Sequence, residues 1–503
     1  MKKIISILII LFLFFSAALF FFAFQNFLGN KIFYFSFTVI SFFSLIYSFR
    51  KNGFFIEKFF IIYLWLGFWL KFSLFQGLFI NDPPGGLGNF NFTKDSFSEL
   101  MVISSLPFAG VTISSIILNR ISFLHNCLNN NFLQRLYDNL RSPILISITF
   151  LILIVSVLNY KFGIYQKGLI PTSELPFLIS GFFKWLYLMG FGVILSLLIK
   201  YELDSKKDVQ HQVYLIVILE SFVSNFALLS RAMIFNVSSI FYGLFKSLKF
   251  NEDYKKKIIK FFFYYILILI LFLTSIPIIN EIRNQVYYQA EKIEIDKKKH
   301  LHVKTSTLGI QKIVNTIKKN KFISYFDDKN VVSIKIFKAL QLVYIRFVGI
   351  ESLMAVSSYE KLGFFNFKEA FDEKINYSNY NHYYLKYNLL EKEDSNVKFL
   401  EDKKDLQEKQ YTIHIPGIVA FLYYSGSKVF LFFSIFILSI IFYSFERFVY
   451  FSSSGNLILT AFVSHIISYR LAHFGYVPTQ SYLFFGALLT TIFTIFLFNK
   501  FFK

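Results

Sequence analysis

The chain contains a succession of apolar runs, each about as long as a lipid bilayer is thick. A membrane-spanning helix needs about 17–25 predominantly apolar residues. Runs of that kind occur near residues 4–24, 32–49, 59–80, 99–118, 144–160, 177–199, 261–279, 427–445, 456–472 and 481–499. Because 55% of the 503 residues are hydrophobic, a soluble fold of this length could not bury its apolar surface. The sequence therefore predicts an all-α polytopic membrane protein.

A further apolar run, 213–245, is too long for one ordinary span, and the surrounding charges indicate its topology. The positive-inside rule places the N-terminal Lys2 and Lys3 in the cytoplasm. The cationic loops 50–58, 119–143 and 200–212 then fall on the same side. The lysine-rich segment 246–260 belongs there too, which requires 213–245 to cross twice as a helical hairpin. We thus expect about twelve spans with both termini cytoplasmic. A single crossing would instead place the C-terminus outside.

These crossings divide the chain into three parts. Residues 1–279 would hold about nine spans, 280–417 a large periplasmic insert that is partly helical, and 418–503 about three more spans. Within the insert, 331–360 has the apolar spacing of an amphipathic helix whose second half could lie on or dip into the membrane.

A second stretch of the insert, INYSNYNHYYLKYN (375–388), is dense in Tyr and Asn. Aromatic rings can stack on sugar faces and amides can bond to hydroxyls, so Tyr380, His382 and Tyr383 are candidate glycan-binding residues. The same composition also occurs in ordinary loops.

Composition and motifs exclude several classes of function. The net charge of +21 comes mostly from residues that flank apolar runs, which indicates topology rather than nucleic-acid binding. The single cysteine, Cys127, excludes an internal disulfide. The sequence has no GxxxxGK[ST], HExxH or GxSxG motif. It has no evident metal-ligand spacing either, so we expect no metal and no cofactor.

A group of cations falls in the outer halves of the predicted spans or next to them. Ionisable residues in a membrane are costly and commonly functional. Any one of these cations could extend to the headgroups on its own, but a shared level favours an outward-facing recess for a lipid-linked phosphate or pyrophosphate. The candidates are Lys71, Lys184, Arg231, Arg283, Arg346 and Arg470.

Several acids and bases accompany these cations. Glu351 and His473 are the candidate catalytic bases. Glu220 falls in the middle of the first arm of the hairpin, where we expect it to pair with a buried cation. His465 lies deeper in its span and is expected to be a hydrogen-bonded core residue.

Three stretches carry a resemblance to a known family. They are SRAMIFN (230–236), RFVGIESLMAVSSY (346–359) and YRLAHFGYVPTQSY (469–482). Together with the many spans and a large external loop late in the chain, they resemble the bacterial O-antigen polymerases, also called oligosaccharide repeat unit polymerases. The architectural likeness covers most of the chain. The sequence lacks the arginine-x10-glycine repeat of some of these polymerases.

The resemblance implies a metal-independent glycosyltransferase on the outer face of the bacterial inner membrane. Such an enzyme transfers a growing glycan from undecaprenyl pyrophosphate to the non-reducing end of a new lipid-linked repeat unit. Arg231, Arg346 and Arg470 would then bind the pyrophosphate, and Glu351 or His473 would act as base. The implied partners are the undecaprenyl-pyrophosphate-linked oligosaccharide, membrane lipid and a chain-length regulator.

Other functions remain open from the sequence. An O-antigen ligase shares the architecture but transfers the finished glycan to lipid A-core. A lipid-linked oligosaccharide flippase or another transporter would also have many spans and buried cations. A glycosyltransferase that uses a polyprenyl-phosphate monosaccharide usually has an acid in its first external loop, and QNFLGNK (25–31) has none.

Overall fold

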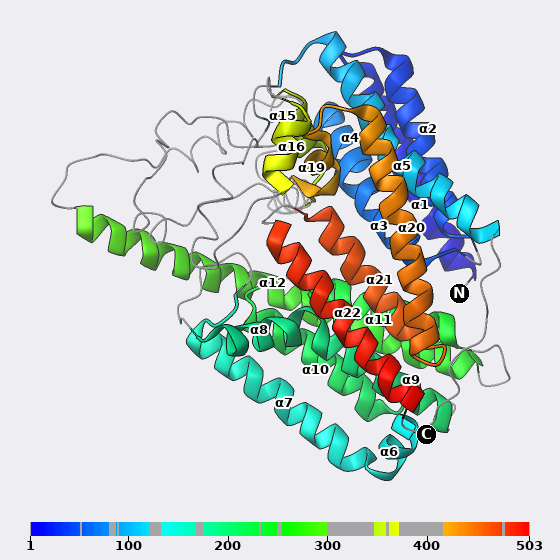
Figure 1. The fold of residues 1–503 in the computed structure, drawn as a ribbon, viewed down its shortest axis with the longest axis vertical. Helices are drawn as coiled ribbons and strands as arrows, with labels where there is room; N and C mark the ends of the chain where they lie inside the picture. The colour runs from blue at the N-terminus through cyan, green and yellow to red at the C-terminus, as the bar shows by residue number, and fades with distance from the viewer. Residues whose placement is uncertain are drawn as a thin grey trace.

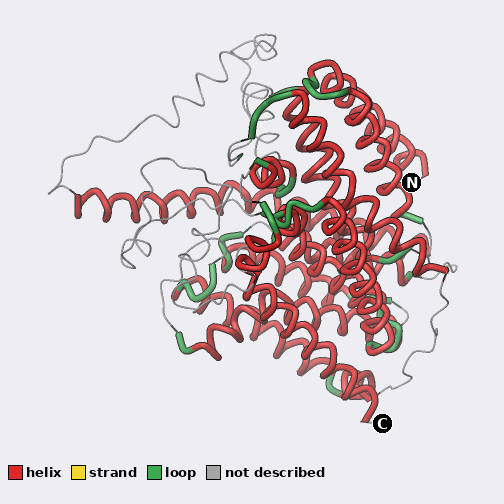
Figure 2. Tube along the Cα trace, turned by 45° about the horizontal axis from the view of Figure 1, so that its top comes forward, coloured by secondary structure: helices red, strands yellow, loops and turns green. Residues whose placement is uncertain are grey.

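A computed structural model shows a helical protein. The structure describes residues 2–50, 53–79, 87, 90–120, 132–166, 175–206, 208–230, 233–248, 254–298, 347–358, 362–371, 416–474 and 478–501. Across these residues the chain forms helices joined by short loops, and no strand occurs (Figure 2). The all-α class predicted from the sequence is confirmed.

Eight helices of the described chain are long and apolar enough to cross a membrane. They are Lys31–Ser48, Phe55–Gly77, Lys94–Asn119, Arg141–Phe162, Leu178–Lys206, Lys256–Arg283, Lys428–Ser452 and Ser481–Phe501. Two shorter apolar helices, Ile10–Asn26 and Leu457–Ala472, accompany them. The protein is thus a polytopic membrane protein, and the finer count of about twelve spans stays a prediction.

The helices form two groups that meet mainly at one shared helix (Figure 1). The first group consists of α1 (Lys2–Asn26), α2 (Lys31–Ser48), α3 (Phe55–Leu64), α4 (Lys71–Gly77), α5 (Lys94–Arg120) and α20 (Lys428–Ser452). The second consists of α6 (Phe132–Asn139), α7 (Arg141–Phe162), α8 (Phe177–Trp185), α9 (Phe191–Lys206), α10 (His211–Ala227), α11 (Met233–Ser247), α12 (Tyr254–Lys298) and α22 (Pro478–Phe501). Helix α21 (Leu457–Ala472) packs against α3 on one side and against α9 and α11 on the other.

The outer surface is apolar, as a lipid environment requires. Large side chains such as Phe14 on α1, Val157 on α7, Phe263 on α12 and Val429 on α20 are more than half exposed. An apolar surface of this extent is stable in contact with lipid and unfavourable in contact with water. Helices α3 and α4, in contrast, are buried almost all round and form the centre of the first group.

One set of helix ends is joined by polar contacts among the loops that the charges predict to be cytoplasmic. Representative pairs are Arg50 with Glu57, Phe55 N–H with Glu446, Arg447 with the Leu118 carbonyl, Arg141 with Glu202, and Lys260 with Asp208. The opposite ends have their own set, including Asn30 N–H with Ser98, Asn159 with the Ala227 carbonyl, and Gly417 N–H with the Phe474 carbonyl. These polar contacts therefore gather at two opposite ends of the helices, and the side of the membrane that each end faces stays a prediction.

The apolar run 213–245 is split into α10 and α11. Helix α10 ends at Ala227, and Leu229 has a left-handed backbone with φ of 47°. The Ala227 end lies against Asn159, whereas Tyr242 of α11 packs edge-to-face on Phe55 at the opposite end of the bundle. The chain thus reverses its direction between the two helices.

Two of the long apolar helices contain a π-helical turn. In the third predicted span, η1 (Trp65–Leu70) separates α3 from α4, and η2 (Leu186–Gly190) separates α8 from α9. π-Turns insert an extra residue into the helix and occur frequently at functional sites. The first of them matters for the site described below.

Short helices from the predicted insert and from the residues just after it pack against the first group. They are α15 (Ile350–Ser357), α16 (Phe364–Phe371) and α19 (Gly417–Tyr423) (Figure 1). Helix α12 runs without a break through residue 279, where the insert was predicted to begin, and ends at Lys298. The periplasmic position of 280–417 stays a prediction.

Candidate functional site

The structure describes six of the residues that the sequence nominated. Lys71 lies in the first group, Glu351 lies on α15, and Arg470 and His473 lie at the end of α21. Lys184 and Arg283 lie in the second group. The other nominated residues lie outside the described part of the chain: Arg231, Arg346, Tyr380, His382 and Tyr383.

Lys71 and Glu351 form a buried ion pair. The Nζ atom of Lys71 lies 2.6 Å from Oε1 of Glu351, and the two side chains are 2% and 6% exposed. The same Nζ donates to the backbone carbonyl of Phe347 at 2.7 Å. Lys71 therefore fixes both Glu351 and the loop in front of α15 to the first turn of α4.

Glycines bring this loop onto the helix at backbone distance. A Cβ added to Gly67 would lie 2.1 Å from the Val348 carbonyl oxygen, and one added to Gly349 would lie 2.1 Å from the Gly67 carbonyl oxygen. No side chain fits at either position without moving the backbone. Gly67 lies within η1, one turn before Lys71, so residues 347–351 pack against the π-turn, the glycine and the lysine together.

Helix α15 is buried on all sides. Ile350 through Val356 are each at most 4% exposed. A helix that is buried all round belongs inside a bundle, although its sequence follows a long polar stretch. Oε2 of Glu351 is buried and has no hydrogen-bond partner among the described residues. One carboxylate oxygen is thus held by Lys71, while the other is left to accept a proton or a hydroxyl hydrogen.

The same loop reaches the end of α21 through Gly417. Gly417 has φ of +68°, and a Cβ at this position would lie 2.8 Å from the Ala472 carbonyl oxygen and 3.3 Å from Cγ1 of Val348. The Gly417 N–H donates to the Phe474 carbonyl at 2.9 Å. Gly417 therefore lies between Val348, next to the Lys71–Glu351 pair, and the residues on either side of His473.

His473 and Arg470 have defined geometry at this end of α21. Nδ1 of His473 lies 3.0 Å from the Tyr469 carbonyl, which can only accept, so Nδ1 carries the hydrogen and Nε2 is the basic nitrogen of the neutral ring. The imidazole stacks on Tyr469 with ring centroids 4.2 Å apart. Nε of Arg470 donates to Ser481 Oγ at 3.1 Å, and its guanidinium lies over Phe484.

A line of aromatic rings extends from His473 into the bundle. His465, Tyr469 and His473 recur every four residues on α21, and Tyr63 of α3 packs beside all three rings. The Tyr63 hydroxyl bonds to Nε2 of His465 at 2.8 Å. The expectation that His465 is a hydrogen-bonded core residue is confirmed, and Tyr63 is a neighbour that the sequence did not nominate.

Lys184 and Arg283 have their contacts in the second group. Lys184 lies over the ring of Tyr165, with Nζ 5.9 Å from its centroid. Arg283 donates to the Leu229 carbonyl at 2.9 Å, next to the break between α10 and α11. These contacts lie at another place in the fold than the junction that contains Lys71, Glu351 and His473.

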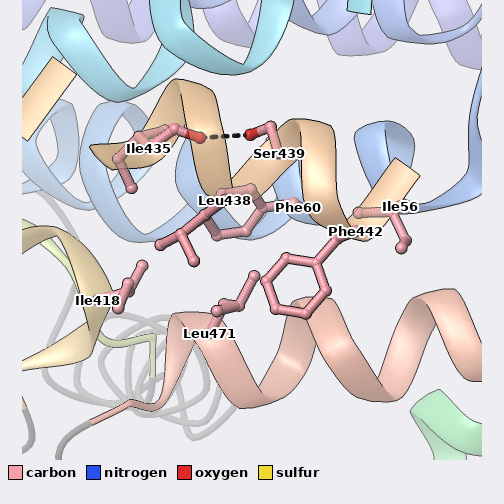
Figure 3. Close-up of a pocket in the computed structure, with 8 residues that line it drawn as sticks. All are labelled: Ile56, Phe60, Ile418, Ile435, Leu438, Ser439, Phe442 and Leu471. Atoms are coloured by element: carbon pink, nitrogen blue, oxygen red, sulfur yellow. Dashed lines mark hydrogen bonds between the residues drawn. The ribbon is translucent and has the colours of Figure 1, made fainter. Parts of the chain in front are cut away.

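A small crevice lies beside this junction, between α3, α19, α20 and α21 (Figure 3). Its cavity volume is about 10 Å³, roughly the room of one water molecule, and it is lined by apolar side chains such as Phe60, Ile418 and Leu471. Its one hydroxyl, on Ser439, donates to the Ile435 carbonyl of its own helix. The crevice offers packing space and no reactive group.

Sequence reasoning missed the glycines and several buried carboxylates. Gly67 stands four residues before Lys71, which was a usable signal for close packing beside the lysine. Glu57 and Glu446 are buried in the first group, where they accept hydrogen bonds from Arg50 and from the first amides of α3, respectively. In the described chain, no group of three or more His, Cys, Asp or Glu residues is arranged to hold a metal.

Comparison with known proteins gives no relative for this chain: no protein-family model, curated protein or solved structure matches it.

Proposed function

We propose that this protein is a membrane glycosyltransferase that polymerises undecaprenyl-pyrophosphate-linked oligosaccharide repeat units on the periplasmic face of the bacterial inner membrane. The product would be a surface polysaccharide such as O-antigen or capsule. The observation that carries the proposal is Glu351, a carboxylate inside the helix bundle with one oxygen anchored by Lys71 and Oε2 unbonded among the described residues.

In this mechanism, Oε2 of Glu351 takes the proton of the acceptor sugar hydroxyl as the hydroxyl oxygen attacks the anomeric carbon of the donor. The bond between that carbon and the pyrophosphate oxygen breaks, and the lipid pyrophosphate leaves with the electron pair. Nε2 of His473 is the alternative proton acceptor, since it belongs to the same junction.

The leaving pyrophosphate needs cations that are fixed in a low-dielectric site. Arg470 lies in the last turn of the helix that leads to His473, and Arg346 directly precedes Phe347, the residue whose carbonyl is bound to Lys71. We assign both to the pyrophosphate, together with Arg231. Lys71 contacts Glu351 and the Phe347 carbonyl, so we reassign it from binding the pyrophosphate to positioning Glu351 as the base.

The test is a gel of surface glycans from a deletion strain complemented by wild type, by Glu351→Gln or by Glu99→Gln. Glu99 is the matched control because both side chains of its ion pair with Lys428 are exposed. A polymerase predicts that Glu351→Gln leaves a single repeat on the core and removes the long ladder, while Glu99→Gln restores it. Equal amounts of each tagged protein in the membrane exclude a folding defect.

Other gel patterns would identify another function. Loss of every attached repeat from the deletion strain indicates the ligase, or the flippase if lipid-linked repeats accumulate on the cytoplasmic side. An unchanged ladder in the deletion strain rejects glycan assembly for that polymer.

A further inference from the structure

Five glutamates of the described chain are buried, and one of them differs from the others in its partners. The set is Glu57, Glu202, Glu220, Glu351 and Glu446. Four of them meet a cation or two backbone amides. Glu220 of α10 has a single recorded donor, the Ser224 hydroxyl one turn further on, at 2.9 Å.

The four other carboxylates each have a cation or several hydrogen-bond donors as partners. Glu57 accepts from Arg50 and Ser115, Glu202 from Arg141 and Tyr137, and Glu351 from Lys71. Glu446 accepts from the first two amides of α3 and from Ser464. Each arrangement replaces the lost hydration of the negative charge.

Glu220 lacks such compensation in the described structure. The sequence predicts a buried cation as its partner, and the ion pairs of the described chain do not include one for it. The residue is only 3% exposed. An ionised carboxylate cannot remain in such a place with one hydroxyl as its donor, whereas a protonated carboxyl can.

The helices around α10 supply polar groups that are already engaged or are acceptors. On η2 the Tyr187 hydroxyl donates to Ser156 of α7, and Asn159 of α7 donates to the Tyr165 and Ala227 carbonyls. On α10 itself, the buried Oδ1 of Asn225 has no partner among the described residues. None of these groups brings positive charge to Glu220.

The charged groups on the neighbouring helices have recorded contacts at the ends of the bundle. Arg283 of α12 bonds to the Leu229 carbonyl, which lies nine residues beyond Glu220 and past the end of α10. Lys184 of α8 lies over Tyr165, while Lys200 of α9 and Lys260 of α12 pair with Asp204 and Asp208.

We propose that Glu220 is an intramembrane proton-binding site. The folded protein holds this carboxyl in its protonated form, and the proton leaves only when α10 separates from α7 and α9 and water reaches the side chain. The inference is independent of glycosyl transfer, because it rests on contacts of the second helix group alone.

The direct test compares infrared spectra of purified wild type and Glu220→Gln in lipid at neutral pH. The wild type is expected to show the carbonyl band of a protonated carboxylic acid, shifted in D₂O and absent from the variant. Glu99→Gln is the matched control, because it should remove an exposed carboxylate and leave the acid band in place. If the wild type instead shows a carboxylate band that Glu220→Gln lacks, the proposal is overturned.

Thermal stability in detergent gives a second and separate readout. Glutamine has nearly the shape and polarity of a protonated glutamate, so Glu220→Gln should fold and melt like wild type at about pH 4, where the folded and the unfolded chain both hold the proton. As the pH rises from there toward neutrality, the wild type should lose stability relative to the variant, because the unfolded chain releases a proton that the folded state retains. A variant that does not fold would mean that the ionised form is required, which contradicts the proposal.

Two further outcomes would assign Glu220 a different cation. Stabilisation of wild type but not of Glu220→Gln by NaCl relative to KCl would identify a sodium site. An acid band that appears only in Arg231→Met would show that Arg231 neutralises Glu220. Either result overturns the proposal.

Discussion

Lys71 Nζ and Glu351 Oε1, which belong to segments far apart in the sequence, meet at 2.6 Å in the interior of the helix bundle. The contact connects the third predicted span to the helix that follows the long polar stretch. Because both side chains have left water, each is stable there only in the presence of the other. The pair therefore decides where residues 347–357 sit.

Removal of one partner of this pair should destabilise the protein more than removal of both. Lys71→Met leaves Glu351 charged and buried, which costs about 3–5 kcal/mol for pairs of this kind. The double variant Lys71→Met/Glu351→Met should recover a large part of that loss. Thermal melting followed by size-exclusion fluorescence in detergent measures both effects.

Lys200→Met is the matched control for this prediction. Its pair with Asp204 is a partly exposed contact within one helix, worth about 0.3–0.5 kcal/mol. If Lys71→Met melts no lower than Lys200→Met, the ion pair does not hold the segment.

A methyl group at Gly67 should disrupt the packing of residues 347–351 against η1. Alanine is otherwise the better helix former by about 1 kcal/mol, but here its Cβ would lie 2.1 Å from the Val348 carbonyl. We expect Gly67→Ala to lower the melting temperature and Gly181→Ala, which meets nothing within 4 Å, to leave it equal or higher. Equal behaviour of the two variants would contradict the close backbone contact.

Glu446 should stabilise α3 as a cap supplied by another helix. Its two carboxylate oxygens accept from Phe55 N at 2.8 Å and Ile56 N at 2.7 Å, where α3 has no side-chain cap of its own. Glu446→Ala orphans both donors, at about 1–3 kcal/mol each. Ser444→Ala is the control, since its exposed hydroxyl bonds only within its own helix and should change stability by less than about 0.5 kcal/mol. Similar melting temperatures for the two variants would exclude the capping role.

The one native cysteine offers a test of the predicted topology. Cys127 falls in the loop 119–143, which the charges place in the cytoplasm. A membrane-impermeant maleimide should therefore label it only after the membrane is permeabilised. In a Cys127→Ser background, Ser173→Cys should react in intact cells and Ser247→Cys should not. Labelling of Ser247→Cys from outside would mean that 213–245 crosses once.

The sequence could predict some residues of the candidate site, but not which of them contact one another. Lys71, Glu351 and His473 were nominated because ionisable residues in or beside apolar runs are costly. Nothing in their spacing indicated that Lys71 would bind Glu351 or that Gly417 would lie between Val348 and the end of α21. For Glu220 the sequence predicted a cationic partner, and the recorded donor is Ser224.

The sequence by itself determined that this chain is a helical membrane protein, since a membrane helix satisfies its own backbone hydrogen bonds and local hydropathy suffices to specify it. It also indicated that the run 213–245 exceeds one span, and the structure divides that run at Leu228–Ser230. The tertiary structure alone decided which buried charges meet. Their partners come from distant segments, as with Glu446 and the first turn of α3, and a partner of that kind leaves no periodic signal in the chain.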